Sequence, residues 1–324
     1  MRVAVVGASG YLGSFIALWM KKVGHEVVGV FRTPPVDPGH LFDVLDLTLK
    51  CDVTDESFTS QVVACQPEVV VYMVSLNHHD SEKDYHQSIN VNVAPLVSLG
   101  HRLSHTNNFK RLIYFSTIQV YGSIPRGKVV TEATPVCPVN MYGLSHALCE
   151  QGLFFLQKQH LLDSVSLRLS NGYGAPVFSS CDCWWLVLND FCRTAFESET
   201  IQLRSDGSPQ RDFVHLEDIA RIIDVLAQSR ENLPSVINLA SGQTMTMLEL
   251  AHLVAAVFQD KYGKPIPVLM PDGSESSVLT KIGSNDRFEI QCNPAINPTQ
   301  HIYKDMTEGI VNIFDFLART WVPR

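Results

Sequence analysis

The chain has 324 residues, of which 45% are hydrophobic and 18% are charged, and its formal net charge is −8 at pH 7. Because a domain averages about 150 residues, this length predicts one large or two ordinary domains with a core that needs no disulfides or metals. The acidic balance argues against a nucleic-acid-binding protein, which usually carries a basic excess. We also expect no membrane span and no signal peptide, because no apolar run approaches about 18 residues and the first residues read as a strand.

The eight cysteines suggest neither a metal site nor a disulfide framework. They contain no Cys-x-x-Cys pair, and Cys181 and Cys183 lack a second pair at the usual spacing of a zinc site. Without a secretory signal, reduced thiols are the simplest expectation, which predicts a cytoplasmic protein.

The first half of the chain alternates short β-branched runs with helical patterns. Near-continuous apolar runs predict strands buried on both faces of a sheet, at Arg2–Val6, Glu26–Phe31, Val69–Met73, Arg111–Phe115 and Ser164–Leu169. Helical patterns separate them, at Tyr11–Val23, Glu56–Ala64, Ile89–His105 and Tyr142–Lys158. This alternation predicts βαβ units and an α/β fold built on a doubly wound parallel sheet.

The pattern changes after Asn171, where a segment rich in glycine, proline and polar residues runs to Gln210. A strand-like run follows at Ser235–Ala240, and helical patterns follow at Leu248–Gln259 and Thr307–Thr320. We therefore expect residues 1–170 to bind a dinucleotide, together with a returning segment near 212–240. Residues 171–324 are expected to form a smaller C-terminal α/β domain that binds the substrate.

A glycine-rich loop joins the first predicted strand to the first predicted helix. It reads Gly7-Ala8-Ser9-Gly10-Tyr11-Leu12-Gly13. Small residues let the backbone turn sharply and approach a pyrophosphate, while the helix N-terminus directs its free N–H groups at the anion. In this position the loop predicts an NAD(P)-binding Rossmann-type fold, rather than a merely tight structural turn.

The end of the second predicted strand favours NADP(H), with NAD(H) as the alternative. An NAD site needs an acidic residue there for the ribose hydroxyls, but the chain reads Val30-Phe31-Arg32-Thr33. The planar guanidinium of Arg32 suits a 2′-phosphate, and the alternative is a solvated surface arginine. Asp52, followed by Val53, ends the next strand-like segment, where its carboxylate would contact the adenine amino group or cap the following helix.

Four further segments follow in a fixed order. They are Phe115-Ser116-Thr117-Ile118-Gln119-Val120-Tyr121-Gly122, Tyr142-Gly143-Leu144-Ser145-His146, Arg168-Leu169-Ser170-Asn171-Gly172-Tyr173-Gly174-Ala175-Pro176 and Arg211-Asp212-Phe213-Val214-His215-Leu216-Glu217-Asp218. With the glycine loop, they resemble the extended short-chain dehydrogenase/reductases, and more narrowly their nucleotide-sugar epimerase, dehydratase and reductase branch. The resemblance implies hydride transfer between a nicotinamide cofactor and a nucleotide-diphosphate sugar.

The resemblance assigns the chemistry to Thr117 and Tyr142, which act on a sugar hydroxyl or ketone. A tyrosine has a pKa of about 10, so it needs help to act as a base at neutral pH. In the family a lysine four residues after the tyrosine supplies positive charge and holds the nicotinamide ribose, but this chain has His146 there. Either a protonated His146 holds the ribose and lowers the tyrosine pKa in place of lysine, or catalysis is impaired and the chain only binds a dinucleotide.

A second departure argues against a 4,6-dehydratase. Those enzymes carry an acid pair after the threonine, where this chain has Ile118 and Gln119. Epimerisation or reduction remains, most often at C4 of the sugar. The sequence separates a 4-ketoreductase from a 4-epimerase only through Arg32, which favours the reductase because reductases consume NADPH. A reductase of a non-nucleotide carbonyl compound is a further alternative.

The resemblance also implies residues that contact the nucleotide diphosphate and the sugar, namely Asn171, Arg204, Arg211 and Gln119. An arginine suits an oxyanion through bidentate geometry, whereas a buried salt bridge of Arg211 with Asp212 or Asp218 is the alternative.

The loop after Val69–Met73 flanks the nicotinamide and the sugar in the family. Val74 and Ser75 are therefore expected beside the cofactor, and His78 and His79 beside the sugar. With the aspartate that follows, the two histidines suggest a metal site, but adjacent loop histidines seldom form one without further ligands, so we expect none.

The family also implies a homodimer. In it, the helices at Ile89–His105 and Tyr142–Lys158 would pack against the same pair of a second copy as a four-helix interface.

Overall fold

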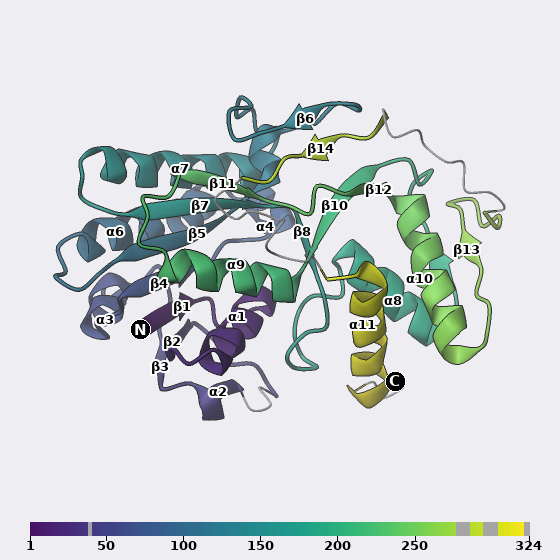
Figure 1. Ribbon diagram of the computed structural model, residues 1–324, viewed down its shortest axis with the longest axis horizontal. Coiled ribbons are helices and arrows are strands. Elements are labelled where there is room, and N and C mark those ends of the chain that lie inside the picture. The colour runs from purple at the N-terminus through teal and green to yellow at the C-terminus, as the bar shows by residue number, and fades with distance from the viewer. Residues whose placement is uncertain (38–40, 277–285, 294–303, 321–324) are drawn as a thin grey trace.

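The computed structural model describes residues 1–37, 41–276, 286–293 and 304–320. Its centre is a seven-stranded sheet in the order β11-β7-β5-β4-β1-β2-β3, in which every neighbouring pair is parallel (Figure 1). The strands are β1 Arg2–Val6, β2 Glu26–Phe31, β3 Leu47–Lys50, β4 Val69–Tyr72, β5 Arg111–Thr117, β7 Ser164–Leu169 and β11 Val236–Leu239. The expected doubly wound parallel sheet is confirmed.

Helices cover both faces of this sheet (Figure 1). On one face lie α1 (Tyr11–Lys22) and α9 (Leu216–Gln228), and on the other lie α3 (Phe58–Ala64), α6 (Ala94–Leu103) and α7 (Met141–Lys158). Alternate residues of β1 serve the two layers, because Val3 and Val5 pack with α1 and α9 while Ala4 and Val6 pack with α3, α6 and α7. A strand buried on both faces must be apolar at every position, which explains its continuous apolar run.

The helix expected at Ile89–His105 is interrupted near its start. Ile89–Val93 form a π-helical turn, and regular α-helix runs only over Ala94–Leu103. Pro95 has no N–H to donate to the helical ladder, so the regular repeat restarts beside it. Three short helices also lie outside the predicted elements: α2 Leu41–Val44, α4 His78–Lys83 and α5 Tyr85–Ser88.

The later residues build a second layered body beside the sheet (right in Figure 1). It contains the three-stranded sheet β12-β10-β8 and the strand pair β9–β13, while the pair β6–β14 packs separately, near Val120 and Ala147. These strands are β6 Val129–Val130, β8 Asn171–Tyr173, β9 Ile201–Gln202, β10 Gln210–His215, β12 Thr244–Thr246, β13 Val268–Leu269 and β14 Glu289–Ile290. Its helices are α8 Val187–Ser198, α10 Met247–Tyr262 and α11 Met306–Thr320.

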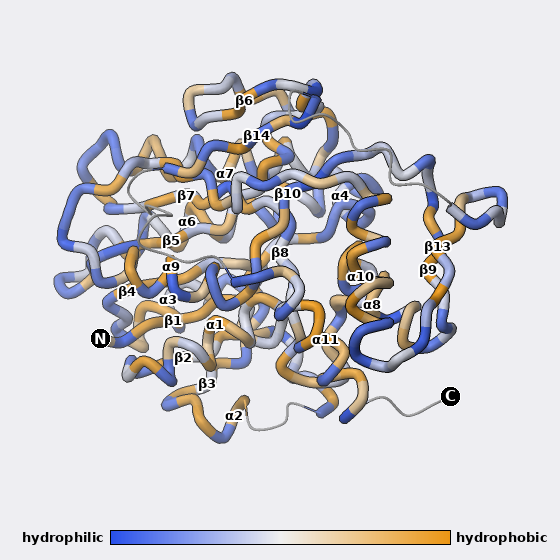
Figure 2. The backbone as a smooth tube through the Cα atoms, turned by 45° about the vertical axis from the view of Figure 1, so that its right-hand side comes forward, coloured by the Kyte–Doolittle hydropathy of each residue, from blue (hydrophilic) through white to orange (hydrophobic). Residues whose placement is uncertain are grey.

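The three helices α8, α10 and α11 pack on one another around a second apolar core, which includes Leu250, Val254, Ile313 and Phe314. Figure 2 shows apolar residues gathered in the strands of the large sheet and along these helices. Among the described residues, no helix combines the length and the apolar composition that a bilayer crossing requires.

A buried ion pair ties α7 to the sheet. The Glu150 carboxylate on α7 accepts hydrogen bonds from Arg168 Nε and Nη2 on β7 at 3.0 and 2.7 Å, and from Ser116 Oγ on β5 at 2.5 Å. Arg168 Nη1 also donates to the Tyr121 hydroxyl at 2.8 Å. The side chains of Glu150 and Arg168 are only 2% and 5% exposed, so each charge depends on the other.

Replacing Glu150 with glutamine is expected to lower the free energy of unfolding by about 3–5 kcal/mol, because Arg168 keeps a buried charge without its counter-ion. Urea unfolding at neutral pH measures this change. The matched control is Glu199→Gln, which removes an exposed ion pair with Lys264 and is expected to change stability by less than about 0.5 kcal/mol. Equal effects of the two substitutions would contradict the assignment.

Candidate active site

A cavity of about 540 Å³ lies where β1, β2, β3 and β4 end. We call it the glycine-loop cavity. Most of the residues expected to hold a dinucleotide line it: Gly7, Ser9, Gly10, Tyr11, Arg32, Asp52, Val53, Val74 and Ser75. Leu12 and Gly13 do not line it, since Leu12 packs into the core and Gly13 is buried at the start of α1.

Close contacts between backbone groups fix the conformation of the glycine loop. Gly7 has a φ of +100°, and the N–H groups of Gly7 and Ala8 both donate to the Val30 carbonyl, at 2.8 and 3.0 Å. A Cβ on Gly13 would lie 2.0 Å from the Gly7 carbonyl oxygen, so only glycine fits there. Helix α1 begins at Gly10 without a side-chain cap, which leaves its first N–H groups directed toward the cavity. This cradle fits a pyrophosphate.

The far end of the same cavity carries one cation and one carboxylate. The Arg32 side chain is 73% exposed, and its Nη1 lies 3.7 Å from Asp52 Oδ2. Asp52 Oδ1 accepts hydrogen bonds from the N–H and hydroxyl of Thr54, and the backbone hydrogen bond is the main reason why its pKa lies below the ordinary value. Asp52 does not cap α3, because Ser57 is the residue that precedes that helix.

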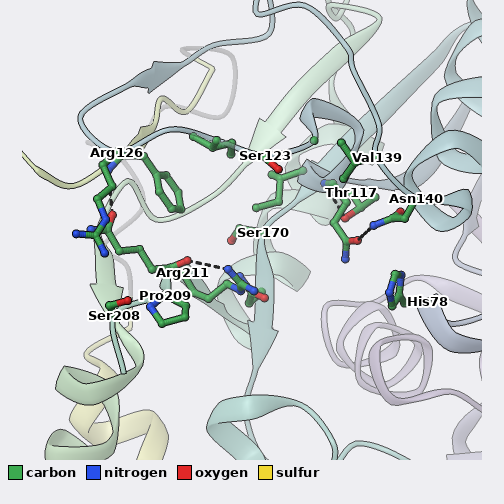
Figure 3. A pocket seen from close by; sticks show the side chains of 17 residues that line it. His78, Thr117, Ser123, Arg126, Val139, Asn140, Ser170, Ser208, Pro209 and Arg211 are labelled. Carbon is green, nitrogen blue, oxygen red and sulfur yellow. Dashed lines mark hydrogen bonds between the residues drawn. The ribbon is translucent and has the colours of Figure 1, made fainter. Parts of the chain in front are cut away.

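A second cavity, of about 660 Å³, lies between the ends of β5 and β7 and the three-stranded sheet. We call it the Thr117 cavity. In Figure 3, His78, Thr117 and Asn140 stand at one end of it, and Arg126 and Ser208 stand at the other. Four expected contact residues line it: His78, Gln119, Asn171 and Arg211.

Arg211 is free to meet an anion in this cavity. Its guanidinium donates to the Gln210 carbonyl at 2.9 Å, and within the described residues it forms no ion pair. The carboxylate of Asp212 instead accepts from Ser170 and Ser241, and that of Asp218 accepts from the Lys304 N–H. Both salt bridges that were the alternative for Arg211 are therefore wrong.

Thr117 lines the second cavity, whereas Tyr142 lines neither cavity and contacts a residue of the first. Thr117 ends β5, is buried, and lines the Thr117 cavity, while its Oγ1 accepts from the Gln119 N–H at 3.2 Å. Tyr142 occupies the first turn of α7, and its side chain hydrogen-bonds Ser75, which lines the glycine-loop cavity. Burial raises the pKa of the Tyr142 hydroxyl above its ordinary value, although Ser75 opposes the shift.

The start of α7 is set by two neighbours. Asn140 caps the helix, and its Oδ1 accepts from the Gly143 N–H at 2.7 Å. A Cβ on Gly143 would lie 2.7 Å from the Gln119 carbonyl oxygen, so glycine lets the helix approach the turn after β5.

His146 is buried and neutral, which corrects one expectation. It is 3% exposed, and burial lowers its pKa to about 4. Its Nδ1 lies 2.6 Å from the Tyr114 hydroxyl, and its Nε2 is buried without a hydrogen-bond partner. The idea that a protonated His146 lowers the pKa of Tyr142 as a lysine does is therefore wrong. The orphaned Nε2 fits a ribose hydroxyl, although His146 does not line the glycine-loop cavity.

Two expected contact residues lie outside both cavities. The Arg204 side chain is 85% exposed and contacts Asp190 at 3.1 Å. His79 is exposed on α4, which Asn77 caps by accepting from the Asp80 N–H. Among the described residues, no three His, Cys, Asp or Glu side chains are grouped as metal ligands.

Several cavity residues were not predicted. Arg126, Asn140 and Ser170 line the Thr117 cavity, and Trp185, for which the sequence favours core packing over a pocket wall, lines the glycine-loop cavity. Arg126 and Trp185 lie in irregular segments, where no periodicity marks a residue's direction. Asn140 precedes a predicted helix, so its capping position was the signal that identifies it.

The sequence profile of the NAD-dependent epimerase/dehydratase family matches residues 3–240. The chain belongs to this family. Its resemblance to the extended short-chain dehydrogenase/reductases is thereby confirmed.

Relatives in this family perform more than one reaction. The chain is 26% identical over 279 residues to a dTDP-6-deoxy-L-talose 4-dehydrogenase (NAD(P)(+)) of Kitasatospora kifunensis, with 84% of each chain covered. It is 25% identical over 309 residues to a UDP-glucose 4-epimerase of Lacticaseibacillus casei, with 89% of each covered. It is also 24% identical over 270 residues to a dTDP-glucose 4,6-dehydratase of Streptomyces niveus, which covers 78% of this chain and 76% of that one.

Solved structures show the same fold. A UDP-glucose 4-epimerase of Thermus thermophilus in complex with NAD has a TM-score of 0.80 at 22% identity, covering 99% of this chain and 100% of that one. A UDP-glucuronic acid 4-epimerase of Bacillus cereus with UDP-glucuronic acid and NAD has a TM-score of 0.78 at 19% identity, covering 98% and 99%.

Substituting Gly13 with alanine is expected to abolish dinucleotide binding, because the new methyl group would displace the Gly7 carbonyl and open the loop. Calorimetric titration with NADP(H) and NAD(H) measures the loss. Gly172→Ala is the control, since its Cβ meets neighbours only at ordinary contact distances of 3.4 Å or more. Binding to Gly13→Ala at the strength of the control would refute this role of the loop.

Proposed function

We propose that this chain is an NAD(P)-dependent oxidoreductase or isomerase of a nucleotide-diphosphate sugar, acting at C4 as a 4-ketoreductase or a 4-epimerase. The observation that carries the proposal is that Thr117 lines a cavity with an unpaired arginine, while Tyr142 hydrogen-bonds Ser75, which lines a cavity with a glycine cradle. The names of the relatives, which act on dTDP- and UDP-linked sugars, support the same substrate class.

The glycine-loop cavity would hold the cofactor. The glycine loop and the start of α1 would bind the pyrophosphate, and Asp52 and Val53 the adenine. Arg32 favours NADP(H), because an exposed guanidinium at the end of β2 suits a 2′-phosphate. Val74, Ser75 and His146 Nε2 would border the nicotinamide riboside, which supplies the hydride when bound.

The Thr117 cavity would hold the nucleotide sugar. Arg211 and Asn171 would meet the diphosphate, joined by Arg126, which lines the same cavity. His78 and Gln119 would border the sugar. Arg204 and His79 have no part in this arrangement, since neither lines the cavity.

Tyr142 would exchange a proton with the oxygen at the reacting carbon, and Thr117 would hold that oxygen by a hydrogen bond. Ile118 and Gln119 follow the threonine, and neither supplies the acid and base of a water elimination. We therefore disfavour a 4,6-dehydratase, although one relative carries that activity. The neutral His146 favours a second candidate, a dinucleotide-binding protein without turnover.

Two binding measurements separate these functions. Mass spectrometry of nucleotides released from the purified protein would show tightly held NAD for an epimerase and NADP(H) for a reductase. A thermal-shift screen against nucleotide-diphosphate sugars should raise the unfolding temperature with at least one of them. No response to any sugar nucleotide would leave a non-nucleotide carbonyl compound as the substrate class.

Replacing Tyr142 with phenylalanine is expected to lower the rate of hydride transfer by about 10²- to 10⁴-fold, because the proton donor is lost, while both ligands still bind. Stopped-flow absorbance of the nicotinamide measures the rate. Tyr85→Phe is the control, since Tyr85 is 61% exposed and lines neither cavity. Unchanged transfer in the Tyr142→Phe variant would exclude this tyrosine.

We also propose that the chain forms a homodimer through α6 and α7. The outer face of α7 exposes Leu144, Leu148 and Phe155, and Phe155 is 60% exposed. Phe155→Glu is expected to convert dimer to monomer in light scattering, because it places a charge in an apolar interface. Val36→Glu, at a site 96% exposed, should have no effect. A monomeric wild-type protein would exclude the dimer.

A further inference from the structure

Tyr142 packs against His146, the first of several buried, uncharged side chains that are joined by hydrogen bonds. The ring centroids of Tyr142 and His146 lie 4.5 Å apart, and His146 Nδ1 lies 2.6 Å from the Tyr114 hydroxyl. Tyr114 also hydrogen-bonds Cys149, whose thiol donates to the Asn92 carbonyl at 3.2 Å. His146, Tyr114, Cys149 and Asn92 are each at most 3% exposed, so bulk water does not reach these side chains.

The donors fix the direction of these hydrogen bonds. Because the Cys149 thiol donates to Asn92, its sulfur is left to accept from the Tyr114 hydroxyl. The Tyr114 oxygen then accepts the N–H of His146 Nδ1. His146 Nε2 is then left with a lone pair and forms no hydrogen bond of normal geometry within the described residues. The Phe115 backbone is near enough to the ring to oppose the lowering of its pKa, but burial outweighs this effect.

The elements packed around Tyr142 add no compensating charge. The loop after β4 contributes the neutral Ser75, and α4 contributes His78 and Glu82, whose carboxylate accepts from the Met141 N–H at 2.5 Å. Within the described residues, no lysine or arginine influences the Tyr142 hydroxyl. Arg168 of β7, which contacts α7, is already paired with Glu150.

We propose that the neutral pair of His146 and Tyr114 keeps Tyr142 as a proton donor and thereby directs this site toward reducing a ketone of its nucleotide sugar, rather than toward oxidising the alcohol. The proposal rests on the function proposed above and selects the reductase within it. Tyr114 acts through His146 and is a positioning residue.

The reduction balances with groups already in place. The carbonyl carbon accepts a hydride from a reduced nicotinamide, the carbonyl oxygen accepts the Tyr142 proton, and an alcohol and an oxidised nicotinamide leave. The Tyr142 phenolate then takes a proton from solvent. Oxidation must start from the phenolate, and each unit by which the tyrosine pKa exceeds the working pH lowers that form about tenfold.

The titration of Tyr142 in the free protein tests this proposal without any substrate. NMR of carbon-labelled tyrosine, assigned with Tyr142→Phe, is expected to show Tyr142 still protonated above about pH 10 in the wild type. In His146→Lys, which restores a cation, it is expected to titrate at least one unit lower. A wild-type midpoint below about pH 9 overturns the proposal even if the lysine variant fails to fold.

A second test measures both reaction directions against pH. In the wild type, oxidation should rise about tenfold per pH unit up to about pH 10, whereas reduction should be level near neutrality. A level oxidation rate at neutral pH would overturn the direction that we propose but leave the proposed function intact. Hydride transfer in neither direction, with the expected titration, would instead reject the proposed function.

The role of Tyr114 can be tested by substitution, with a matched control residue on the neighbouring strand. Tyr72 lies opposite Tyr114 in the register of β4 and β5, is fully buried, and has a hydroxyl without a partner. Tyr114→Phe should weaken cofactor binding roughly five- to tenfold by releasing the His146 ring, and Tyr72→Phe should not. Equal effects would show that Tyr114 only fills the core.

Discussion

The position of Tyr142 depends on how α7 is attached to the ends of the central strands. Asn140 caps the helix, and Gly143 brings it against the turn after β5, where any side chain would meet the Gln119 carbonyl at 2.7 Å. Two turns further on, Glu150 pairs with Arg168 inside the core. These contacts hold one face of α7 against β5 and β7. They leave the Tyr142 side chain hydrogen-bonded to Ser75, which lines the glycine-loop cavity.

On α7, the buried charged residues stabilise the fold and are not the residues that take part in the proposed chemistry. The ion pair that α7 buries is also hydrogen-bonded by Ser116 and Tyr121. The residue that packs on the ring of the reacting tyrosine, His146, is neutral instead, because burial lowers its pKa to about 4. The overall charge of −8 therefore says little about the ligands. Anions would be met by local donors, namely the glycine loop, Arg126 and Arg211.

The sequence predicted the regular parts of this fold well, for physical reasons that differ along the chain. β1, β2 and β7 have the predicted bounds because each contains a run of buried residues and is followed by a glycine, a charged or a polar residue. Most residues predicted to hold the cofactor do line the glycine-loop cavity, since a strand–turn–helix fixes where its residues point. Arg204 and His79 were placed by resemblance alone, in irregular or short segments, and they lie outside both cavities.

The protonation state of His146 could be assigned only from the structure. Its neighbours Tyr114 and Cys149 come from β5 and from the next turn of α7, and a sequence shows neither their burial nor their hydrogen bonds. The same holds for Arg126, which reaches the Thr117 cavity from a loop without periodicity.

The proposed function depends on hydride passing between ligands bound in the two cavities. The direct measurement is transfer of deuterium from nicotinamide-labelled NADPH to 4-keto nucleotide sugars, followed by mass spectrometry and NMR of the product. We predict that the label appears at C4 of the sugar with the wild-type protein and is absent with Tyr142→Phe. Binding of both ligands without any transfer of deuterium to the sugar would contradict the account.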